Sequence, residues 1–157
     1  MATSALLSIN PYTHPATAHE DLFNGNLTTD IISLANYGSA VFVLTKGPGA
    51  TGTATITVES CDDTSATTST AVAYNYAACT SGNTWGNITA AGAAGFTTTA
   101  GANQCYMIEI RDDQLSGSDK YVRAVFTETA NDPVDGAVIS IGMNPKFPAD
   151  PPKEMIT

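Results

Sequence analysis

The chain has 157 residues, of which 43% are hydrophobic and only 13% are charged, and its formal net charge is −9. This length corresponds to about one domain and allows a substantial core to be buried. With six Lys and Arg residues against 15 Asp and Glu residues, the chain is poorly suited to nucleic acid or anionic lipid, since both require clustered cations. A basic protein partner or simple solubility explains the acidic balance better.

From the sequence we expect neither a membrane-spanning helix nor a secretory signal. No apolar run approaches the roughly 20 residues of a membrane-spanning helix, and the first residues lack the basic and long apolar segments of a secretory signal. The three cysteines, Cys61, Cys79 and Cys105, match no zinc or redox motif. We expect reduced, buried thiols. A Cys61–Cys79 disulfide is the alternative, because both residues lie near predicted strand ends.

Residues 1–28 differ from the rest of the chain. Prolines disfavour a regular helix around residues 9–15, and the apolar residues that follow have no periodicity. This pattern predicts an extended arm that lies on another protein surface, and the Pro-rich residues 144–157 predict an extended tail. The residues expected to contact a partner are Ile9, Pro11, Tyr12, Leu22, Phe23 and Phe147.

From residue 29 to residue 143 short apolar or alternating runs are separated by turn residues. Residues 53–60 alternate strictly between threonine and apolar residues, which is typical of a half-buried strand, and residues 40–45 form a continuous apolar run. The predicted strands are 31–37, 40–45, 53–60, 71–77, 96–100, 104–110, 120–128 and 137–142, with a long mobile connection over 80–95. Together with the absence of an amphipathic helix, they predict an all-β, jelly-roll-like sandwich.

Candidate metal ligands are few and poorly placed. His14 and His19 form the first cluster with Glu20 and Asp21, and it falls in the predicted arm, where no rigid element would hold the ligands. Acidic residues that could converge on calcium occur in two predicted loops, without EF-hand spacing. They are Asp62, Asp63, Asp112, Asp113 and Asp119. Because aspartate favours turns, we interpret them as turn residues and assign no metal ligand and no cofactor.

No nucleophile elbow, P-loop, dinucleotide fingerprint or zincin motif occurs, and no catalytic residue is assigned. Tyr74 and Tyr76 are two residues apart on one predicted strand and therefore share a face. With Trp85 they could form a platform on which sugars stack, although packing in the core or against a subunit is the commoner fate of such aromatic residues. A carboxylate pair for glycoside hydrolysis is a further alternative that nothing in the sequence positions.

Several segments resemble small virion proteins of tailed bacteriophages. The resemblance lies in residues 29–37 (TDIISLANY), 49–59 (GATGTATITVE), Cys61-Asp62-Asp63, 95–101 (GFTTTAG) and Tyr121-Val122-Arg123. The resemblance spans about residues 29–143. Within the virion proteins, this region is similar to the capsid decoration, or cement, proteins. No catalytic motif accompanies it.

The resemblance implies a non-enzymatic β-sandwich that is assembled in the host cytoplasm and sits on the virion surface. Its expected partners are the major capsid protein and further copies of itself in a symmetric oligomer, for which a trimer is favoured. The first alternative is a tail or vertex domain that binds host-surface glycans. The second is a small glycan-processing enzyme built on the same fold.

Overall fold

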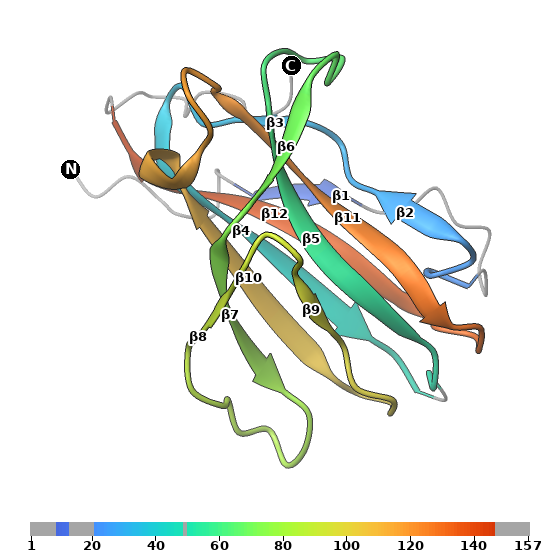
Figure 1. The fold of residues 1–157 in the computed structure, drawn as a ribbon. Coiled ribbons are helices and arrows are strands. Elements are labelled where there is room, and N and C mark those ends of the chain that lie inside the picture. Colours follow the sequence, from blue (N-terminus) through green and yellow to red (C-terminus); the bar gives the residue numbers. More distant parts are fainter. Residues whose placement is uncertain (1–8, 13–20, 49, 147–157) are drawn as a thin grey trace.

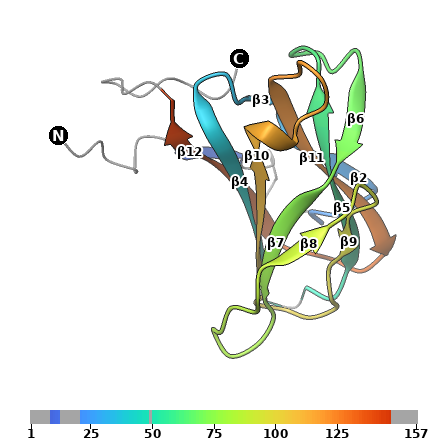
Figure 2. The same cartoon turned by 60° about the vertical axis from the view of Figure 1, so that its left-hand side comes forward.

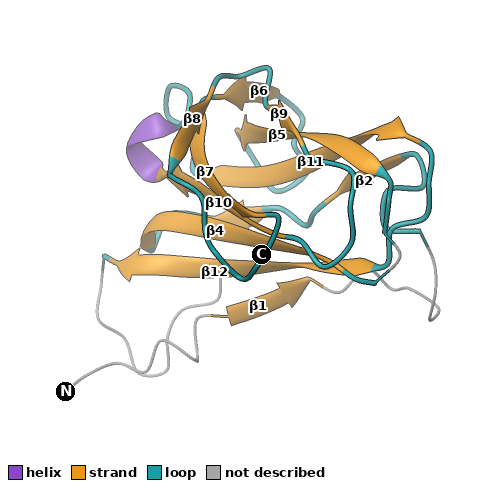
Figure 3. Ribbon diagram, turned by 90° about the horizontal axis from the view of Figure 1, so that it is seen from below, coloured by secondary structure: helices purple, strands orange, loops and turns teal. Residues whose placement is uncertain are grey.

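The computed structural model describes the backbone of residues 9–12 and, in full, residues 21–48 and 50–146. Two antiparallel sheets are packed face to face (Figures 1 and 2), and Figure 3 shows the two layers edge-on. One short 3-10 turn, η2 (Asp112–Gln114), is the sole helical element in this part of the chain. This architecture confirms the predicted all-β sandwich.

Within the described residues each sheet has six strands, and every pairing is antiparallel. Sheet A has the order β1 (Ile9–Tyr12), β12 (Gly136–Pro145), β4 (Tyr37–Lys46), β10 (Cys105–Arg111), β7 (Tyr74–Cys79), β8 (Thr89–Ala91). Sheet B has the order β2 (Asn26–Thr28), β11 (Tyr121–Ala130), β5 (Thr53–Cys61), β6 (Ser69–Val72). Two short strands join sheet B off this path, β3 (Ile32–Ser33) on β11 and β9 (Phe96–Thr97) on β5.

The core lies between the sheets and follows the alternation in the sequence. In β5 Ala54, Ile56 and Val58 are fully buried, and the threonines between them point outward. Phe42 of β4 and Phe126 of β11 are also fully buried, from the opposite sheets. Apolar burial at these positions supplies most of the stabilisation of the fold.

One predicted strand is two strands in different sheets. Residues 71–77 were expected to be continuous, but β6 ends at Val72 in sheet B and β7 begins at Tyr74 in sheet A. Ala73 is exposed where the chain changes sheet. Val72 and Tyr74 are both buried, so an even spacing of apolar residues is kept across the corner. The periodicity could not reveal the break for that reason.

The predicted boundary of the N-terminal arm at residue 28 is wrong, because residues 21–28 belong to the sandwich. Leu22 and Phe23 were expected to contact a partner, yet they lie in the core of their own chain, 5% and 0% exposed. The Phe23 ring stacks on Phe126, and Asp21 Oδ1 accepts hydrogen bonds from the backbone N–H groups of Phe23 and Val134. Distant partners therefore fix this segment.

The other predicted contact residues are differently placed. The backbone of Ile9–Tyr12 forms β1, which pairs with β12 and is the edge strand of sheet A (Figure 3). Ile9 lies opposite Ile141 and Pro11 opposite Ile139. An edge position suits Pro11, which has no N–H to donate. The side chains of Ile9, Pro11 and Tyr12, and all of Phe147, lie outside the described residues.

The predicted start of the tail at residue 144 is at least three residues too early. Asn144 and Pro145 complete β12, and Lys146 is held against the domain. Its N–H donates to the Asn36 carbonyl, and its Nζ donates to the Leu34 carbonyl at 3.0 Å and pairs with Asp112 at 2.7 Å. The packed domain therefore extends at least to residue 146.

A buried lysine joins two loops at one end of the sandwich. Lys46, at the end of β4, is only 3% exposed, and its Nζ donates to the carbonyl oxygens of Gly52 at 2.8 Å and Thr99 at 2.9 Å. Burial lowers the pKa of Lys46 below its ordinary value of 10.5, because the protein interior disfavours the cation.

Replacing Phe23 with alanine tests whether this residue belongs to the core. We expect Phe23→Ala to lower the free energy of unfolding by about 3–5 kcal/mol, the usual cost of removing a buried aromatic side chain. Urea unfolding followed by circular dichroism measures this. The control, Thr127→Ala on the exposed side of β11, should stay within about 0.5 kcal/mol of wild type. An unchanged midpoint in Phe23→Ala would restore the arm assignment.

The Lys46 environment predicts a pH-dependent stability difference. Below both pKa values the folded and unfolded states each carry the cation. As pH rises past the lowered folded pKa towards 10.5, the folded state loses its proton first, so the wild type gains stability relative to Lys46→Met. Urea unfolding of both proteins at about pH 7 and about pH 10 measures the gap. A gap that stays constant would contradict the assignment.

Candidate functional site

The outer face of sheet B is a hydroxyl-covered surface. Thr55 and Thr97 share a hydrogen bond of 2.8 Å between their hydroxyl groups, and Thr53 and Thr129 share another of the same length. Beside them, in register on β5 and β11, Glu59 pairs with Arg123. Side chains of this kind satisfy one another and remain hydrated. The polar groups of these three pairs are therefore satisfied within the face.

The outer face of sheet A is apolar over four adjacent strands. In β4 Val41 and Val43 point outward and are half-buried, whereas Ala40, Phe42 and Leu44 point into the core. The strand register places the outward residues in rows, one of which crosses all four strands without a polar side chain. We call these residues the apolar face: Val41, Val43, Ala77, Met107, Ile139 and Ile141.

Charge is scarce on this surface. Among the described residues that point outward from β12, β4, β10 and β7, the charged ones are Glu109 and Arg111, on a chain of net charge −9. Contiguous apolar patches on a soluble domain usually mark an interaction site. The apolar face is the surface of the described chain that best fits such a role.

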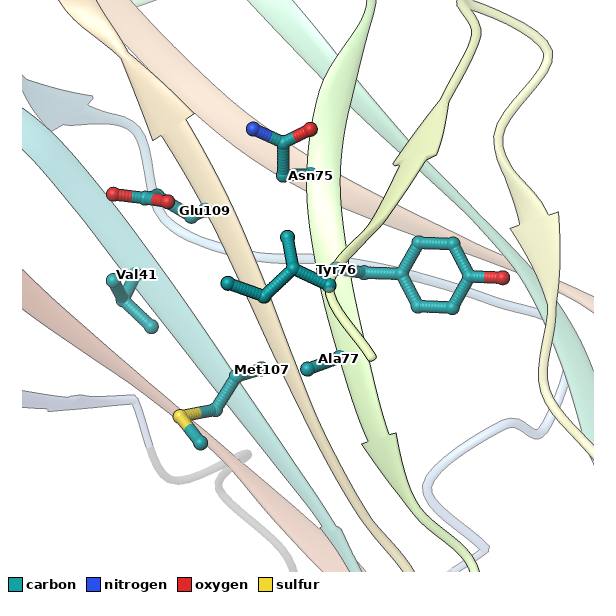
Figure 4. Close-up of a pocket in the computed structure, with 7 residues that line it drawn as sticks. Val41, Asn75, Tyr76, Ala77, Met107 and Glu109 are labelled. Carbon is teal, nitrogen blue, oxygen red and sulfur yellow. The ribbon is translucent and has the colours of Figure 1, made fainter. Parts of the chain in front are cut away.

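A shallow hollow of about 180 Å³ lies on the apolar face (Figure 4). Val41, Ala77 and Met107 line it, and Asn75 and Glu109 lie at one end. The Tyr76 ring points away from these side chains in Figure 4. A hollow of this size can accept an apolar side chain from a partner, with the amide and carboxylate available to a polar neighbour.

The connection from β7 to β8 extends the same surface. It projects beyond the strand ends (Figures 1 and 2) and carries Trp85 and Ile88, which are 42% and 76% exposed. Ile88 also lines the hollow. At the opposite end of sheet A Met143 is 43% exposed. Residues 80–95 were predicted to be a connection throughout, but Thr89–Ala91 form β8 on β7.

The aspartates considered for calcium make structural contacts instead. Asp63 accepts hydrogen bonds from the N–H groups of Ser65 and Thr67, and these bonds lower the pKa of its carboxyl group. Asp119 accepts a 2.6 Å hydrogen bond from the Ser60 hydroxyl. Asp62 accepts a hydrogen bond from the Thr68 N–H. Asp112 pairs with Lys146, and Asp113 pairs with Arg111.

The described residues contain no group of three or more metal-ligating side chains. Of the first cluster considered for a metal, Asp21 orders the Leu22–Phe23 segment through backbone hydrogen bonds. His14, His19 and Glu20 lie outside the described residues.

The proposed sugar platform is wrong. Tyr74 and Tyr76 do share a face, but it is the inner one, where both contact Phe96 of β9. Tyr74 is 1% exposed and its hydroxyl donates to the Ile56 carbonyl, while Tyr76 stacks on Phe96 with a centroid distance of 3.7 Å. Trp85 is exposed on a loop and does not join them. The sequence could not show which face of sheet A would be the inner one.

The three cysteines are free thiols. Cys61 is fully buried in sheet B, and burial raises its pKa to about 11. The Cys61–Cys79 disulfide is not formed in the structure, because Cys79 ends β7 in sheet A and lies opposite Cys105 of β10. Cys79 and Cys105 are half-buried, so the prediction of buried thiols is confirmed only for Cys61. No local pattern could indicate that Cys79 and Cys105 are neighbours, since 25 residues separate them.

Comparison with known proteins adds no relative. No protein-family model, curated protein or solved structure matches this chain significantly. In the described part of the chain no helix is long and apolar enough to cross a membrane.

The apolar face predicts binding of an apolar dye to the native protein. We expect the double variant Val43→Thr/Ile139→Thr to lower the fluorescence of bound anilinonaphthalene sulfonate by about half or more, because two adjacent apolar contacts are lost. The matched control is Val125→Thr, which points outward from sheet B beside Thr57. Equal dye signals from all three proteins, with unchanged circular dichroism, would show that the face is not an accessible apolar surface.

Proposed function

We propose that this chain is a structural virion protein that decorates the outer surface of a tailed-phage capsid and stabilises the shell across capsomer boundaries. The single observation that carries the proposal is the apolar face, together with the hydroxyl-covered face on the opposite sheet. One side of the sandwich suits a protein partner and the other suits solvent. The resemblance of residues 29–143 to decoration proteins supports the same assignment.

The physical requirements of a cement protein agree with this surface. Such a protein must add binding energy between capsid subunits without any chemistry of its own. Burying the apolar face would contribute about 25 cal/mol for each Å² removed from water. Repetition of one modest interface over a symmetric shell then produces high avidity. A symmetric oligomer, with a trimer favoured, would link several such interfaces.

Charge favours the capsid over a second copy as the occupant of this face. Two copies docked face to face would bring together two chains of net charge −9, and they would repel each other. A less acidic partner avoids this cost. A face that is occupied by the capsid is not available to a second copy, so contacts between copies in the proposed oligomer would use other surfaces.

Introducing one charge on either side of the sandwich tests the docking face. Val43→Asp places a carboxylate in the centre of the apolar face, and Thr57→Asp places the same charge on the outer face of sheet B. We expect Thr57→Asp to co-sediment with expanded heads that lack decoration protein as wild type does. Val43→Asp should lose at least about tenfold in affinity, since a desolvated, unpaired charge costs well over 1.4 kcal/mol.

Sedimentation of the free proteins completes the experiment. Circular dichroism of both variants checks that they are folded. If Val43→Asp dissociates an oligomer but still loads onto heads, the apolar face is an interface between copies. The assignment of this face to capsid binding then fails. If wild type does not bind heads at all, the decoration function itself fails.

A further inference from the structure

Two of the three cysteines are direct neighbours across two strands of sheet A. Cys79 is the last residue of β7 and Cys105 is the first of β10, and they are partners in the antiparallel register. We propose that Cys79 and Cys105 are a redox-active pair, which closes to an intramolecular disulfide in the folded protein when it meets a disulfide oxidant such as oxidised glutathione. This inference does not depend on the decoration function.

The register brings the two residues within bonding reach. Opposite residues in an antiparallel pair have Cα atoms about 4.5–5.5 Å apart and side chains on the same face. Disulfides form over Cα separations of about 4.4–6.8 Å. Burial raises the pKa of the Cys105 thiol, and the neighbouring Cys79 raises it further. No change of register is needed.

Exposure separates this pair from the third cysteine. Cys79 and Cys105 are half-buried on the outer face of sheet A, where a small oxidant can reach them. Cys61 is 0% exposed in sheet B, and its pKa of about 11 leaves almost no reactive thiolate at neutral pH. Cys61 therefore serves as an internal reporter that the fold remains closed during the reaction.

The reaction balances with glutathione disulfide as the oxidant. The Cys79 thiolate attacks one glutathione sulfur, which breaks the glutathione S–S bond and releases one glutathione thiolate. The Cys105 thiolate then attacks the Cys79 sulfur of the mixed disulfide and releases the second glutathione. Two electrons pass to glutathione disulfide, and the two protons lost by the protein thiols are taken up by the two glutathione thiolates.

The bond would close the base of one segment of the chain. The 25 residues between the cysteines pass through the exposed Trp85 loop, return to sheet A as β8, add β9 to sheet B and then lead to β10. Closing a loop of this length removes freedom mainly from the unfolded chain. We expect the oxidised protein to melt about 5–10 °C above the reduced protein.

The experiment uses the full chain, purified reduced and then incubated under native conditions in glutathione buffers. Mass spectrometry should show loss of two hydrogens and a cross-linked peptide pair that joins Cys79 to Cys105. An alkylating reagent added under native conditions should leave Cys61 unmodified throughout the incubation. In Cys105→Ser the mixed disulfide with glutathione should accumulate on Cys79, since the resolving thiol is gone.

Cys61→Ala is the matched control and should form the Cys79–Cys105 bond as wild type does. Three outcomes would overturn the proposal: cross-links that involve Cys61, cross-links only between chains, and oxidation that requires denaturant. If the oxidised protein melts no higher than the reduced one, the expected stabilisation of the fold by the Cys79–Cys105 bond is wrong. Each measurement is independent of capsid binding, so failure of the decoration function leaves this test unaffected.

Discussion

The structure depends on one strand that is apolar on both sides. β4 is paired along its length with β12 on one edge and β10 on the other, and its inward residues, such as Phe42 and Leu44, are fully buried against sheet B. Its outward residues, Val41 and Val43, are equally apolar. Continuous apolar runs are usual in strands that are covered on both faces. In the described part of the chain the sandwich covers only one face of β4, and the open apolar face is the feature on which the proposed docking rests.

The sequence predicted the fold class and most strands because local alternation is decisive where one face meets solvent. β5 follows it from Thr53 to Ser60, and β11 follows it from Tyr121 to Phe126. It failed where the determining contacts are distant. Phe23 is core because it meets Phe126, more than 100 residues away, and no local pattern encodes that contact. The corner at Ala73 was missed because apolar spacing continues through it.

The candidate site could be predicted only in part. The apolar run around Val43 was visible in the sequence, and it indicates a strand buried on both faces. The row from Met107 through Val43 to Ile139 depends on the register of three strands that are far apart in the chain. The same holds for Cys79 and Cys105. Register is set by the global packing of hydrophobic faces, so neighbours of this kind appear only once the sheet is assembled.

The two outer faces of the sandwich differ in polarity. Sheet B presents threonine hydroxyl groups that satisfy one another, and sheet A presents the apolar face, so only one orientation on a partner buries apolar area without burying polar groups. Ile88 lines the hollow on this face from the loop that carries Trp85, and the thiol pair lies at the base of the same loop. We expect that a disulfide there would restrict the loop before docking and reduce the entropy lost on binding. The docking face and the redox-active pair would then act on the same side of the sandwich.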